Sequence, residues 1–505
     1  MPLSLPRVST LNNSTNLPRE NPQESNLWLQ LSTPSTCQKR RWCATDESPP
    51  KRVKLSLKDE YAASSECEER FMETSRMRFR TRVYSPLNQD INLFRGFTVY
   101  TLPILESFVS SCQSDLFRCD ALEHQFLTPP YACSYSNAAK RGSTPFLAVS
   151  TEEGSVHIFN TVKRKEWDTE PSRTTLQPHN NGVFDVKWSP SDSLLATCSG
   201  DKSVRISCPN TSRLLHTFEG HTSSVKRVSW HPLNDSLLST GGRDGTICVW
   251  DLRVPQCTTS SSQGPVFIIP DAHEPLNSKA RRAKHQTPKT VTNLVFTEDM
   301  SLISSGSSDG VLRCWDFRFL SESGIRKPAK SKRFIPSLYS DTDPTTLYGS
   351  RRTRGILSLA VGTGPSSGLL FALGADSRIH TYSASSLTPY PINFTHPNLR
   401  VNGSFYLSSA VSPCGRWLAS GGGESAILFD VAAAAKPYAT ALPGVELKAQ
   451  LGEVYAVDWA DGMLASGADD RTVRVWRPDV DVYRDCLADP EASKWKWCWA
   501  SRSAK

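Results

Sequence analysis

A short pattern of strands and turns repeats along most of the chain, and it limits the possible folds more than any other feature. The clearest copy begins at Gly220-His221 and continues through SSVKRVSW, SLLSTGGRDG and TICVWDLR. Two other strong copies contain TVTNLVF with SLISSGSSDG and VLRCWDFR, and GEVYAVDW with GMLASGADD and RTVRVWRP. Four weaker copies bring the total to seven. Each contains alternating apolar and polar residues between Gly, Ser and Asp, the pattern of β-strands joined by tight turns.

The repeat resembles the WD40 repeat, and its spacing gives the number of copies. The repeats span residues 126–478, with apparent insertions at 254–289 and 319–353, and each copy is then about 40 residues long. Such a unit cannot bury both of its faces alone, so neighbouring units supply the core and the ring must close. We therefore predict an all-β fold, a seven-bladed WD40 β-propeller, preceded by a disordered N-terminal arm.

Four polar or aromatic positions of the best copy match a hydrogen-bonded relay of WD40 domains. They are His221, the hydroxyl pair Ser239 and Thr240, Asp244 and Trp250. By this resemblance His221 and Asp244 are structural residues and poor candidates for an acid–base pair. The chain also contains no P-loop, GxSxG or HExxH motif. We therefore expect a protein that is not an enzyme and has no catalytic residues.

The regions outside the repeats differ in composition. Residues 1–85 are rich in Ser, Pro and Asn without sustained periodicity, which predicts a disordered arm. Residues 86–125 form a lead-in, where 91–100 is a candidate strand for closing the propeller, and 479–505 form a short tail. Two basic clusters in the arm resemble a bipartite nuclear-import signal, which implies a nuclear protein and an import receptor as a partner; the alternative is a solvated charge run. The clusters contain Lys39, Arg40, Lys51, Arg52 and Lys54.

Cysteine spacing and hydropathy argue against a disulfide-rich, a zinc-binding or a membrane-spanning protein. The fourteen cysteines contain no CxxC pair and no cluster with histidine at zinc-site spacing. We interpret them as scattered thiols of a reducing compartment and expect no disulfide, metal or cofactor. No segment approaches the roughly 20 apolar residues that span a bilayer, so we expect no membrane partner.

Basic charge is concentrated in a few segments. The net charge is +8, and Lys and Arg are in excess at 39–54, 279–289 and 326–354. The second and third segments lie in the two insertions, where weak, non-specific and salt-dependent contact with DNA phosphates is one interpretation. Solvated loops are the preferred alternative, because aromatic residues are not interleaved with the charges. The residues concerned are Lys279, Arg281, Arg282, Lys284, Arg351, Arg352 and Arg354.

Two Trp-Asp-x-Arg motifs in consecutive repeats are the most distinctive local feature. They are Trp250-Asp251-Leu252-Arg253 and Trp315-Asp316-Phe317-Arg318. Each arginine follows the third strand of its blade, so both should emerge on adjacent blades, on the face opposite the turns that contain Asp244 and Asp309. Arginine there offers a planar, five-donor fork to a partner. The motif resembles the one by which propellers dock on the large adaptor subunit of cullin-4 ubiquitin ligases, named for damaged-DNA binding. The alternative is ordinary arginines in exposed loops.

A larger set of segments resembles the denticleless family over residues 126–478. The resemblance is carried by TVTNLVFTEDMSLISSGSSDGVLRCWDFR, STGGRDGTICVWDLR, the insertion with KHQTPK between them, and PPYACSYSN with LAVSTEEGSVHIFNT. Members of this family are substrate receptors of cullin-4 ligases. The resemblance implies that the chain recruits replication and cell-cycle proteins whose degron is bound to PCNA on chromatin. The receptor itself then forms no covalent bond, and a ubiquitin-conjugating enzyme of the ligase modifies the target.

The resemblance also suggests where a substrate would bind. If the adaptor occupies the face with Arg253 and Arg318, the substrate meets the opposite face. The family's degron carries an additional basic residue, which implies an acidic patch on the receptor. Acidic residues occupy turns on that face, although Asp is more often a turn residue than a ligand. The candidates are Glu152, Glu153, Glu424, Asp469 and Asp470.

The tail departs from the pattern of animal members of this family. We find no PCNA-binding box after residue 478, and the tail contains Trp495, Trp497 and Trp499 instead. Independent binding to PCNA is therefore not expected from the sequence. The alternative function is a nuclear propeller that binds chromatin or histones without attachment to a ligase.

Overall fold

The computed structural model describes most of residues 101–502. The described ranges are 101–121, 126–165, 167–254, 262–274, 289–317, 335–347, 352–402, 406–432, 434 and 443–502. They all belong to one compact unit, residues 95–505, and the description that follows concerns this unit by itself. The predicted arm at 1–85 and the candidate closing strand at 91–100 lie outside the described residues.

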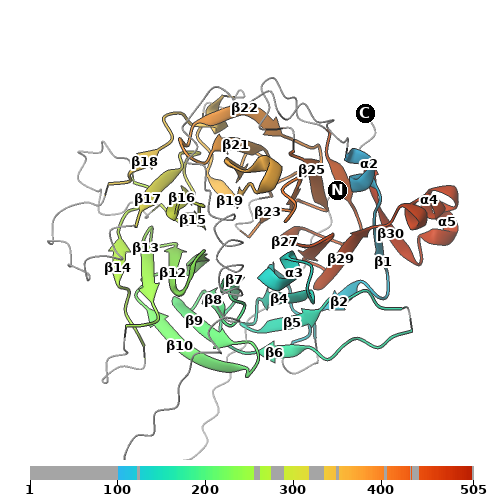
Figure 1. The fold of residues 1–505 in the computed structure, drawn as a ribbon, viewed down its shortest axis with the longest axis horizontal. Coiled ribbons are helices and arrows are strands. Elements are labelled where there is room, and N and C mark those ends of the chain that lie inside the picture. Colours follow the sequence, from blue (N-terminus) through green and yellow to red (C-terminus); the bar gives the residue numbers. More distant parts are fainter. Residues whose placement is uncertain are drawn as a thin grey trace, which may run out of the picture. The chain divides into compact units, whose positions relative to one another are not determined.

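Five four-stranded sheets and one ten-stranded sheet, which joins two blades through β1 and β30, follow one another around a central axis in the described part of the chain (Figure 1). This arrangement confirms the predicted seven-bladed propeller. The first blade contains β3 (Pro130–Tyr135), β4 (Phe146–Thr151), β5 (Val156–Asn160) and β6 (Thr174–Leu176). The second contains β7 (Val183–Trp188), β8 (Leu195–Ser199), β9 (Ser203–Cys208) and β10 (Arg213–Glu219). The third contains β11 (Val225–His231), β12 (Asn234–Gly242), β13 (Ile247–Asp251) and β14 (Phe267–Ile269).

The remaining blades repeat this order from the inner strand outward. The fourth contains β15 (Val291–Phe296), β16 (Ser301–Gly306), β17 (Arg313–Asp316) and β18 (Leu338–Tyr339). The fifth contains β19 (Ile356–Val361), β20 (Leu369–Gly374), β21 (Ile379–Ser383) and β22 (Pro389–Phe394). The sixth contains β23 (Ser409–Val411), β24 (Trp417–Ser420), β25 (Ala426–Asp430) and β26 (Val445–Leu447), and the seventh contains β27 (Val454–Ala460), β28 (Met463–Ala468) and β29 (Thr472–Pro478).

The outermost strands explain why each repeat looked three-stranded in the sequence. β14 and β18 lie inside the segments 254–289 and 319–353, which the sequence pattern predicts to be insertions. Both strands are short, and β18 is not buried, so they carry little of the alternation that marks an inner strand. The two segments therefore supply the fourth strands of the third and fourth blades.

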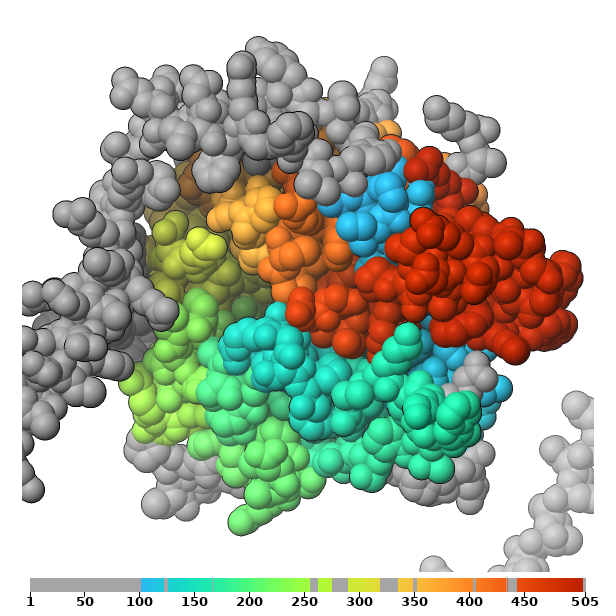
Figure 2. Space-filling view, turned by 45° about the vertical axis from the view of Figure 1, so that its right-hand side comes forward, coloured from blue at the N-terminus to red at the C-terminus, as the bar shows by residue number. Residues whose placement is uncertain are grey.

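The seventh blade is completed by strands from outside the repeats. β1 (Phe108–Ser111) and β2 (Leu116–Arg118) both pair antiparallel with β29, through Val109 opposite Arg477 and Phe117 opposite Val473. These strands lie in the lead-in, after the segment 91–100 that we had considered for this role. On its other edge β1 pairs with β30 (Trp497–Arg502), which also pairs with β26. Figure 2 shows this early segment in blue against the red C-terminal segment.

Helices are few and short. α2 (Leu102–Glu106) precedes β1, and α3 (Asn137–Lys140) lies between β3 and β4. α4 (Val480–Ala488) and α5 (Pro490–Ser493) connect β29 to β30. Two 3₁₀ turns span Pro344–Thr346 and Gly364–Ser366. None of the helices in the described part of the chain has the length and apolar character needed to cross a bilayer.

The core lies between neighbouring blades, as expected for units that cannot bury both faces alone. Trp250, Trp315 and Trp476 lie near the ends of their third strands and are almost fully buried. At the closure of the ring, the ring of Phe108 on β1 meets Trp417 and Trp459 edge-on, with centroids 6.1 and 5.8 Å apart. The side chains of β1 thus join the sixth and seventh blades.

The predicted relay is present in the third blade. The Trp250 indole N–H donates to the Thr240 hydroxyl at 2.8 Å, and this hydroxyl lies 2.8 Å from Nε2 of His221. The other imidazole nitrogen of His221 lies 3.1 Å from the Asp244 carboxylate, which also accepts from the backbone of its own turn. These bonds connect strands within one blade, and His221 and Asp244 are held as structural residues.

Candidate functional site

The direction of the strands divides the ring into two faces. The first and third strands of a blade run the same way, so the ends of β11 and β13 reach the same side. We call this side the arginine face; it contains Arg253 and the turns between first and second strands, such as 297–300. The acidic face is the opposite side; it contains the starts of the inner strands and the turns with Glu152 and Asp469.

On the arginine face, Arg253 is exposed but held in one orientation. Its side chain is 66% exposed, whereas that of Asp251 is 15% exposed. The guanidinium donates to both carboxylate oxygens, with Nη2–Oδ2 at 2.7 Å and Nε–Oδ1 at 2.9 Å, and the Arg253 backbone N–H also donates to Oδ1 at 2.9 Å. Although partial burial opposes the shift, the hydrogen bonds from Arg253 lower the pKa of Asp251.

The second motif occupies the corresponding place in the next blade. Trp315 is buried and donates its indole N–H to Ser304 at 2.8 Å, as Trp250 does to Thr240. Asp316 ends β17 opposite Ser301, and Asp251 ends β13 opposite Leu237. Arg318 lies outside the described residues. The adjacency of two arginines therefore stays a prediction, supported by the matching ends of the two strands.

On the acidic face, the predicted carboxylates do not share one environment. Glu152 and Glu153 occupy the β4–β5 turn, Glu424 the β24–β25 turn, and Asp469 and Asp470 the β28–β29 turn. Glu152, Glu424 and Asp469 are exposed. The Asp470 carboxylate is used within the blade, because it accepts from the Thr472 backbone at 3.1 Å and from the Leu451 backbone at 3.1 Å.

Glu152 and Asp469 border a group of aromatic rings that sequence reasoning missed. Tyr131 is the second residue of β3, Phe184 lies on β7, Tyr455 lies on β27, and Tyr406 precedes β23. Tyr131 and Tyr406 stack with centroids 4.5 Å apart and an interplanar angle of 4°, and Phe184 stacks on Tyr406 at 5.4 Å. Tyr455 meets Tyr131 and Tyr406 edge-on. We call these four residues the aromatic cluster; they extend over four blades at the start of the inner strands.

The aromatic cluster already holds one cation of this chain. The Lys226 ammonium lies 3.9 Å from the ring centre of Phe184 and 5.1 Å from that of Tyr406, a cation–π geometry. Burial, with the nearby Arg227 and Arg243, lowers the pKa of Lys226 to about 8. Burial also raises the pKa of Tyr131, and the hydrogen bond with Glu152 adds to this effect. Rings beside carboxylates form a surface suited to a positively charged group.

A signal for the aromatic cluster was present in the repeats. In GVFDVKW and GEVYAVDW the aromatic residue is the second one of the inner strand, as Tyr131 is in β3. Side chains alternate along a strand, so equivalent positions of neighbouring blades point the same way. Aligning the repeats by register would have brought Tyr131, Phe184 and Tyr455 together.

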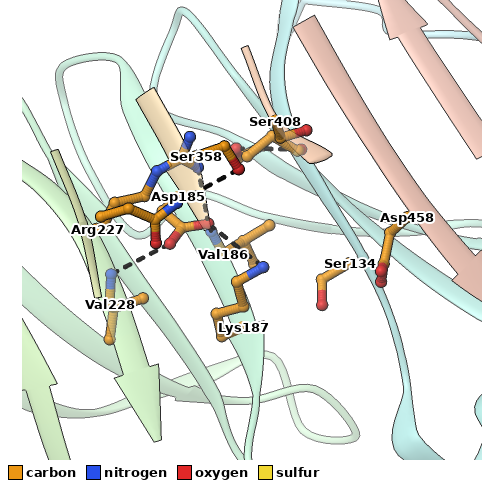
Figure 3. Close-up of polar contacts among 12 residues, drawn as sticks. Ser134, Asp185, Val186, Lys187, Arg227, Val228, Ser358, Ser408 and Asp458 are labelled. Atoms are coloured by element: carbon orange, nitrogen blue, oxygen red, sulfur yellow. Dashed lines mark hydrogen bonds and ion pairs between the residues drawn. The ribbon is translucent and has the colours of Figure 1, made fainter. Parts of the chain in front are cut away.

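A cavity of about 600 Å³ lies along the inner strands. Its lining includes Asp185, Lys187, Arg227, Ser358 and Asp458 (Figure 3). The buried Asp185 carboxylate on β7 accepts from the backbone of Val228 on β11 at 3.1 Å, and it lies 3.7 Å from the Arg227 guanidinium and 3.8 Å from the Lys187 ammonium.

A second carboxylate in the cavity acts in the same way. Asp458 on β27 accepts from the backbone of Tyr135 on β3 at 2.8 Å and pairs with Lys140 at 3.1 Å. Each acid thus links the inner strands of two neighbouring blades. We interpret both carboxylates as structural links between blades. Neighbouring cations compensate their negative charge, and backbone N–H groups donate hydrogen bonds to them.

The other predicted residues fall in different places. Arg352 and Arg354 are exposed at the end of the third basic segment, 326–354. The candidate import signal and most of the candidate DNA-contacting residues lie outside the described part of the chain. These residues are Lys39, Arg40, Lys51, Arg52, Lys54, Lys279, Arg281, Arg282, Lys284 and Arg351.

Comparison with known proteins places the chain among WD40 proteins. Residues 170–206, 212–251, 279–316 and 444–477 match the family described as "WD domain, G-beta repeat". The "Denticleless protein homolog" of Danio rerio is 32% identical over 367 residues, which cover 69% of this chain and 52% of the relative. The human homolog of the same name is 29% identical over 69% of this chain and 46% of the relative.

The similarity extends to insects and to solved structures. "Protein lethal(2)denticleless" of Drosophila melanogaster is 29% identical over 70% of this chain and 45% of its own length. The chain thus spans about half the length of the curated relatives it matches. A chain of the "Crystal Structure of Mitotic Checkpoint Complex" superposes with a TM-score of 0.51 at 18% identity, covering 78% of this chain and 97% of that one. This last likeness concerns the propeller fold alone.

Proposed function

The chain belongs to the denticleless family of WD40 proteins, and from this premise we propose that it is the substrate-recognition subunit of a cullin-4 ubiquitin ligase. The observation that carries the proposal is the presentation of Arg253. Its guanidinium projects from the end of β13 and is oriented by Asp251, while Trp250 is buried in the blade and Asp251 and Leu252 are half-buried. A pre-oriented guanidinium can bind a carboxylate or carbonyl of a partner with little further loss of side-chain entropy.

We assign adaptor docking to the arginine face. Trp250 and Trp315 anchor the two motifs from within their blades, Asp251 and Asp316 end the strands, and Arg253 and Arg318 reach the adaptor. In this arrangement the tryptophans hold the motifs in place within the blades, and the arginines contact the adaptor directly. The partner is the large adaptor subunit of the ligase.

We assign substrate recognition to the acidic face. Glu152, Glu153, Glu424 and Asp469 supply negative charge there, and the aromatic cluster adds rings that can bind a cation. A replication or cell-cycle protein held on chromatin-bound PCNA would present a basic degron to this face. The receptor raises the effective concentration of the target near the ubiquitin-conjugating enzyme and is itself not catalytic.

The proposed function places the protein in the nucleus. The basic clusters at 39–54 would bind an import receptor, and the segments around 279–289 and 326–354 could add weak contact with DNA phosphates. Such contact is salt-dependent and would carry no sequence specificity.

Co-purification from replicating cells tests the ligase assignment. The full chain and the variant with Arg253→Ala and Arg318→Ala are expressed with an affinity tag, and adaptor recovery is measured. We expect the double variant to lose the adaptor while its unfolding midpoint is unchanged. Arg213→Ala, an exposed arginine of β10, is the matched control and should retain it. Undiminished adaptor recovery by the double variant would contradict docking through these motifs.

The aromatic and acidic surroundings of Lys226 also favour a second candidate, a chromatin or histone-binding propeller without ligase attachment. Histone tails are basic and would suit the same face. The two candidates differ in the adaptor: a scaffold of this kind would bind basic peptides but recover no ligase subunit, with or without Arg253.

A further inference from the structure

Two cysteine thiols from distant parts of the sequence meet at the point where the ring closes. Cys112 follows β1 and Cys498 lies on β30, and their Sγ atoms are 3.7 Å apart. Both residues are half-buried and neither is in a disulfide. The two strands lie side by side (Figure 1), with Ser110 opposite Cys498, and the Cys112 backbone N–H donates to the Lys496 carbonyl at 2.8 Å.

The register of the strands accounts for this proximity. Cys498 faces Ser110, and Cys112 is two residues further along β1, so both side chains point to the same side of the sheet. They are therefore diagonal neighbours across the pair of strands. A disulfide needs its sulfur atoms about 2.05 Å apart, so the thiols must approach each other from their present separation. Cys112 lies just beyond the end of β1, in a turn.

The Cys112 thiol has two neighbours that favour its ionised form, the Cys498 thiol and a buried guanidinium. Arg474 on β29 is buried, and its Nη1 lies 3.3 Å from the Ser110 hydroxyl and 3.4 Å from the Ser111 carbonyl, next to Cys112. The hydrogen bond from Cys498 and the charge of Arg474 lower the pKa of Cys112 to about 6, although burial opposes this shift. The same hydrogen bond and burial raise the pKa of Cys498. Cys112 is therefore the thiol of the pair that loses its proton more readily.

Three other cysteines in the described part of the chain lie in a different environment. Cys119, Cys133 and Cys198 are buried in the blades, and burial raises the pKa of each thiol. A thiol that stays protonated is a poor nucleophile. Cys414 is exposed and offers an internal comparison for simple accessibility.

We propose that Cys112 and Cys498 form a peroxide-sensitive pair whose disulfide fastens the C-terminal strand β30 to the closing strand β1. The Cys112 thiolate attacks one oxygen of hydrogen peroxide, the O–O bond breaks, and the departing hydroxide takes a proton and leaves as water. The sulfur of Cys498 then attacks the resulting sulfenic acid, the S–O bond breaks, and the hydroxyl group leaves with the Cys498 proton as a second water. The two thiols supply the two electrons that reduce the peroxide.

A disulfide between Cys112 and Cys498 would constrain the whole propeller, because the two residues lie where the ring closes. β1 completes the seventh blade through β29, and β30 joins β1 to the sixth blade through β26. A disulfide between them encloses nearly all of the propeller in one covalent loop, and cross-links that close long loops restrict the unfolded chain most. Because the thiols are diagonal neighbours and must move to bond, a dithiol reductant should reopen the bond readily.

Peptide mapping of the full chain tests the proposal. The purified protein is treated with hydrogen peroxide, remaining thiols are blocked, and peptides are identified by mass spectrometry without reduction. We expect an intramolecular Cys112–Cys498 cross-link and a rise of several degrees in Tm, both reversed by dithiothreitol. Cys414→Ser should keep the cross-link. If peroxide oxidises Cys414 while Cys112 and Cys498 stay reduced, or pairs either with another cysteine, the proposal is overturned.

Single substitutions separate the roles of the two thiols. In Cys498→Ser the sulfenic acid of Cys112 should persist and be captured by dimedone, whereas Cys112→Ser should give no capture at Cys498. Under reducing conditions the Tm of both variants should match that of the native chain, which checks their folding. The rate of alkylation of Cys112 should rise with pH around a midpoint near 6 in the native chain. A midpoint at the ordinary thiol value near 8.5 would remove the basis for selective oxidation.

Discussion

Asp251 holds the guanidinium of Arg253 through two oxygens, with Nη2–Oδ2 at 2.7 Å and Nε–Oδ1 at 2.9 Å. The carboxylate is mostly buried and the guanidinium mostly exposed, so the pair orients a contact group without burying it. Asp251 is accordingly a positioning residue for the proposed adaptor contact.

Asp251→Asn should weaken adaptor binding several-fold and leave the fold intact. An exposed ion pair contributes about 0–1 kcal/mol to stability, so the unfolding midpoint should hardly change. Adaptor affinity can be measured by titration of the purified components. Asp299→Asn, at an exposed turn of the same face in the next blade, is the matched control. Equal affinity of both variants would assign no positioning role to Asp251.

Thr240→Val should destabilise the third blade strongly. The Thr240 hydroxyl is hydrogen-bonded to the Trp250 indole and to the His221 imidazole. Valine would remove this partner from both rings. A buried polar group left unsatisfied costs about 1–3 kcal/mol, so we expect a loss of roughly 2–4 kcal/mol in urea unfolding. Ser239→Ala is the control, because the described part of the chain offers no partner to the buried Ser239 hydroxyl. Similar losses for both variants would contradict the relay as a stabilising network.

His273→Gln should flatten the fall in stability on acidification. Burial, with Arg313 and Lys289 nearby, lowers the pKa of His273 well below its ordinary value. The unfolded chain then binds more protons below pH 6.5, so the stability present above that pH decreases as the pH falls. One such imidazole contributes a slope of up to about 1.4 kcal/mol per pH unit. The slope is measured from urea unfolding midpoints of the native chain and of His273→Gln between pH 7 and 5.

The seventh blade provides a precedent for this substitution. There Gln450 accepts from Ser466 at 2.6 Å, and Trp476 donates to the same Ser466 hydroxyl at 3.0 Å, as Trp315 does to Ser304 beside His273. His231→Gln is the comparison, since His231 is only half-buried and should change the slope less. Parallel pH profiles for native chain and His273→Gln would show that His273 does not determine the slope.

Reversing the charge of Glu152 and Glu153 should weaken binding of a basic degron peptide by about tenfold or more. Close charge pairs at interfaces contribute on the order of 1.5 kcal/mol or more, and Glu152 also hydrogen-bonds Tyr131 of the aromatic cluster. Fluorescence anisotropy with a labelled peptide measures the affinity. Glu298→Lys makes the same change on the arginine face and should have little effect. Unchanged affinity would remove Glu152 and Glu153 from the site, and Glu424→Lys would then test the sixth blade.

The fold was predictable because its signal is repeated. Seven copies of strand, turn and buried aromatic residue specify a ring even where single copies are weak, and the relay around Thr240 follows the predicted residue types. β14 and β18 were not predictable, since three and two residues at an outer edge are too few for a periodic pattern. A closing strand was expected within the lead-in 86–125, where β1 and β2 lie. Their exact positions were not predictable, because both strands are short and their partners are distant in sequence.

The site was predictable where it lies within one segment. Trp250, Asp251 and Arg253 lie close together in the sequence, and their order at the end of β13 already indicates which group is buried and which is exposed. The aromatic cluster is different, because Tyr131 and Tyr406 stack although the chain between them passes through four other blades. Such a contact depends on the closed ring, and only the register of the inner strands hints at it.

The pairing of β2 with β29 also means that one strand is synthesised long before its partner. The ribosome completes Leu116–Arg118 early and adds the partner residues Thr472–Arg474 roughly 350 residues later. At about 5–20 residues per second, the first of these strands waits for tens of seconds before its neighbour exists. Its unpaired edge is open to other chains throughout that interval. A nascent chain that has not yet reached Thr472 therefore exposes this edge to aggregation, and a chaperone that covers residues 108–118 would protect it during that interval.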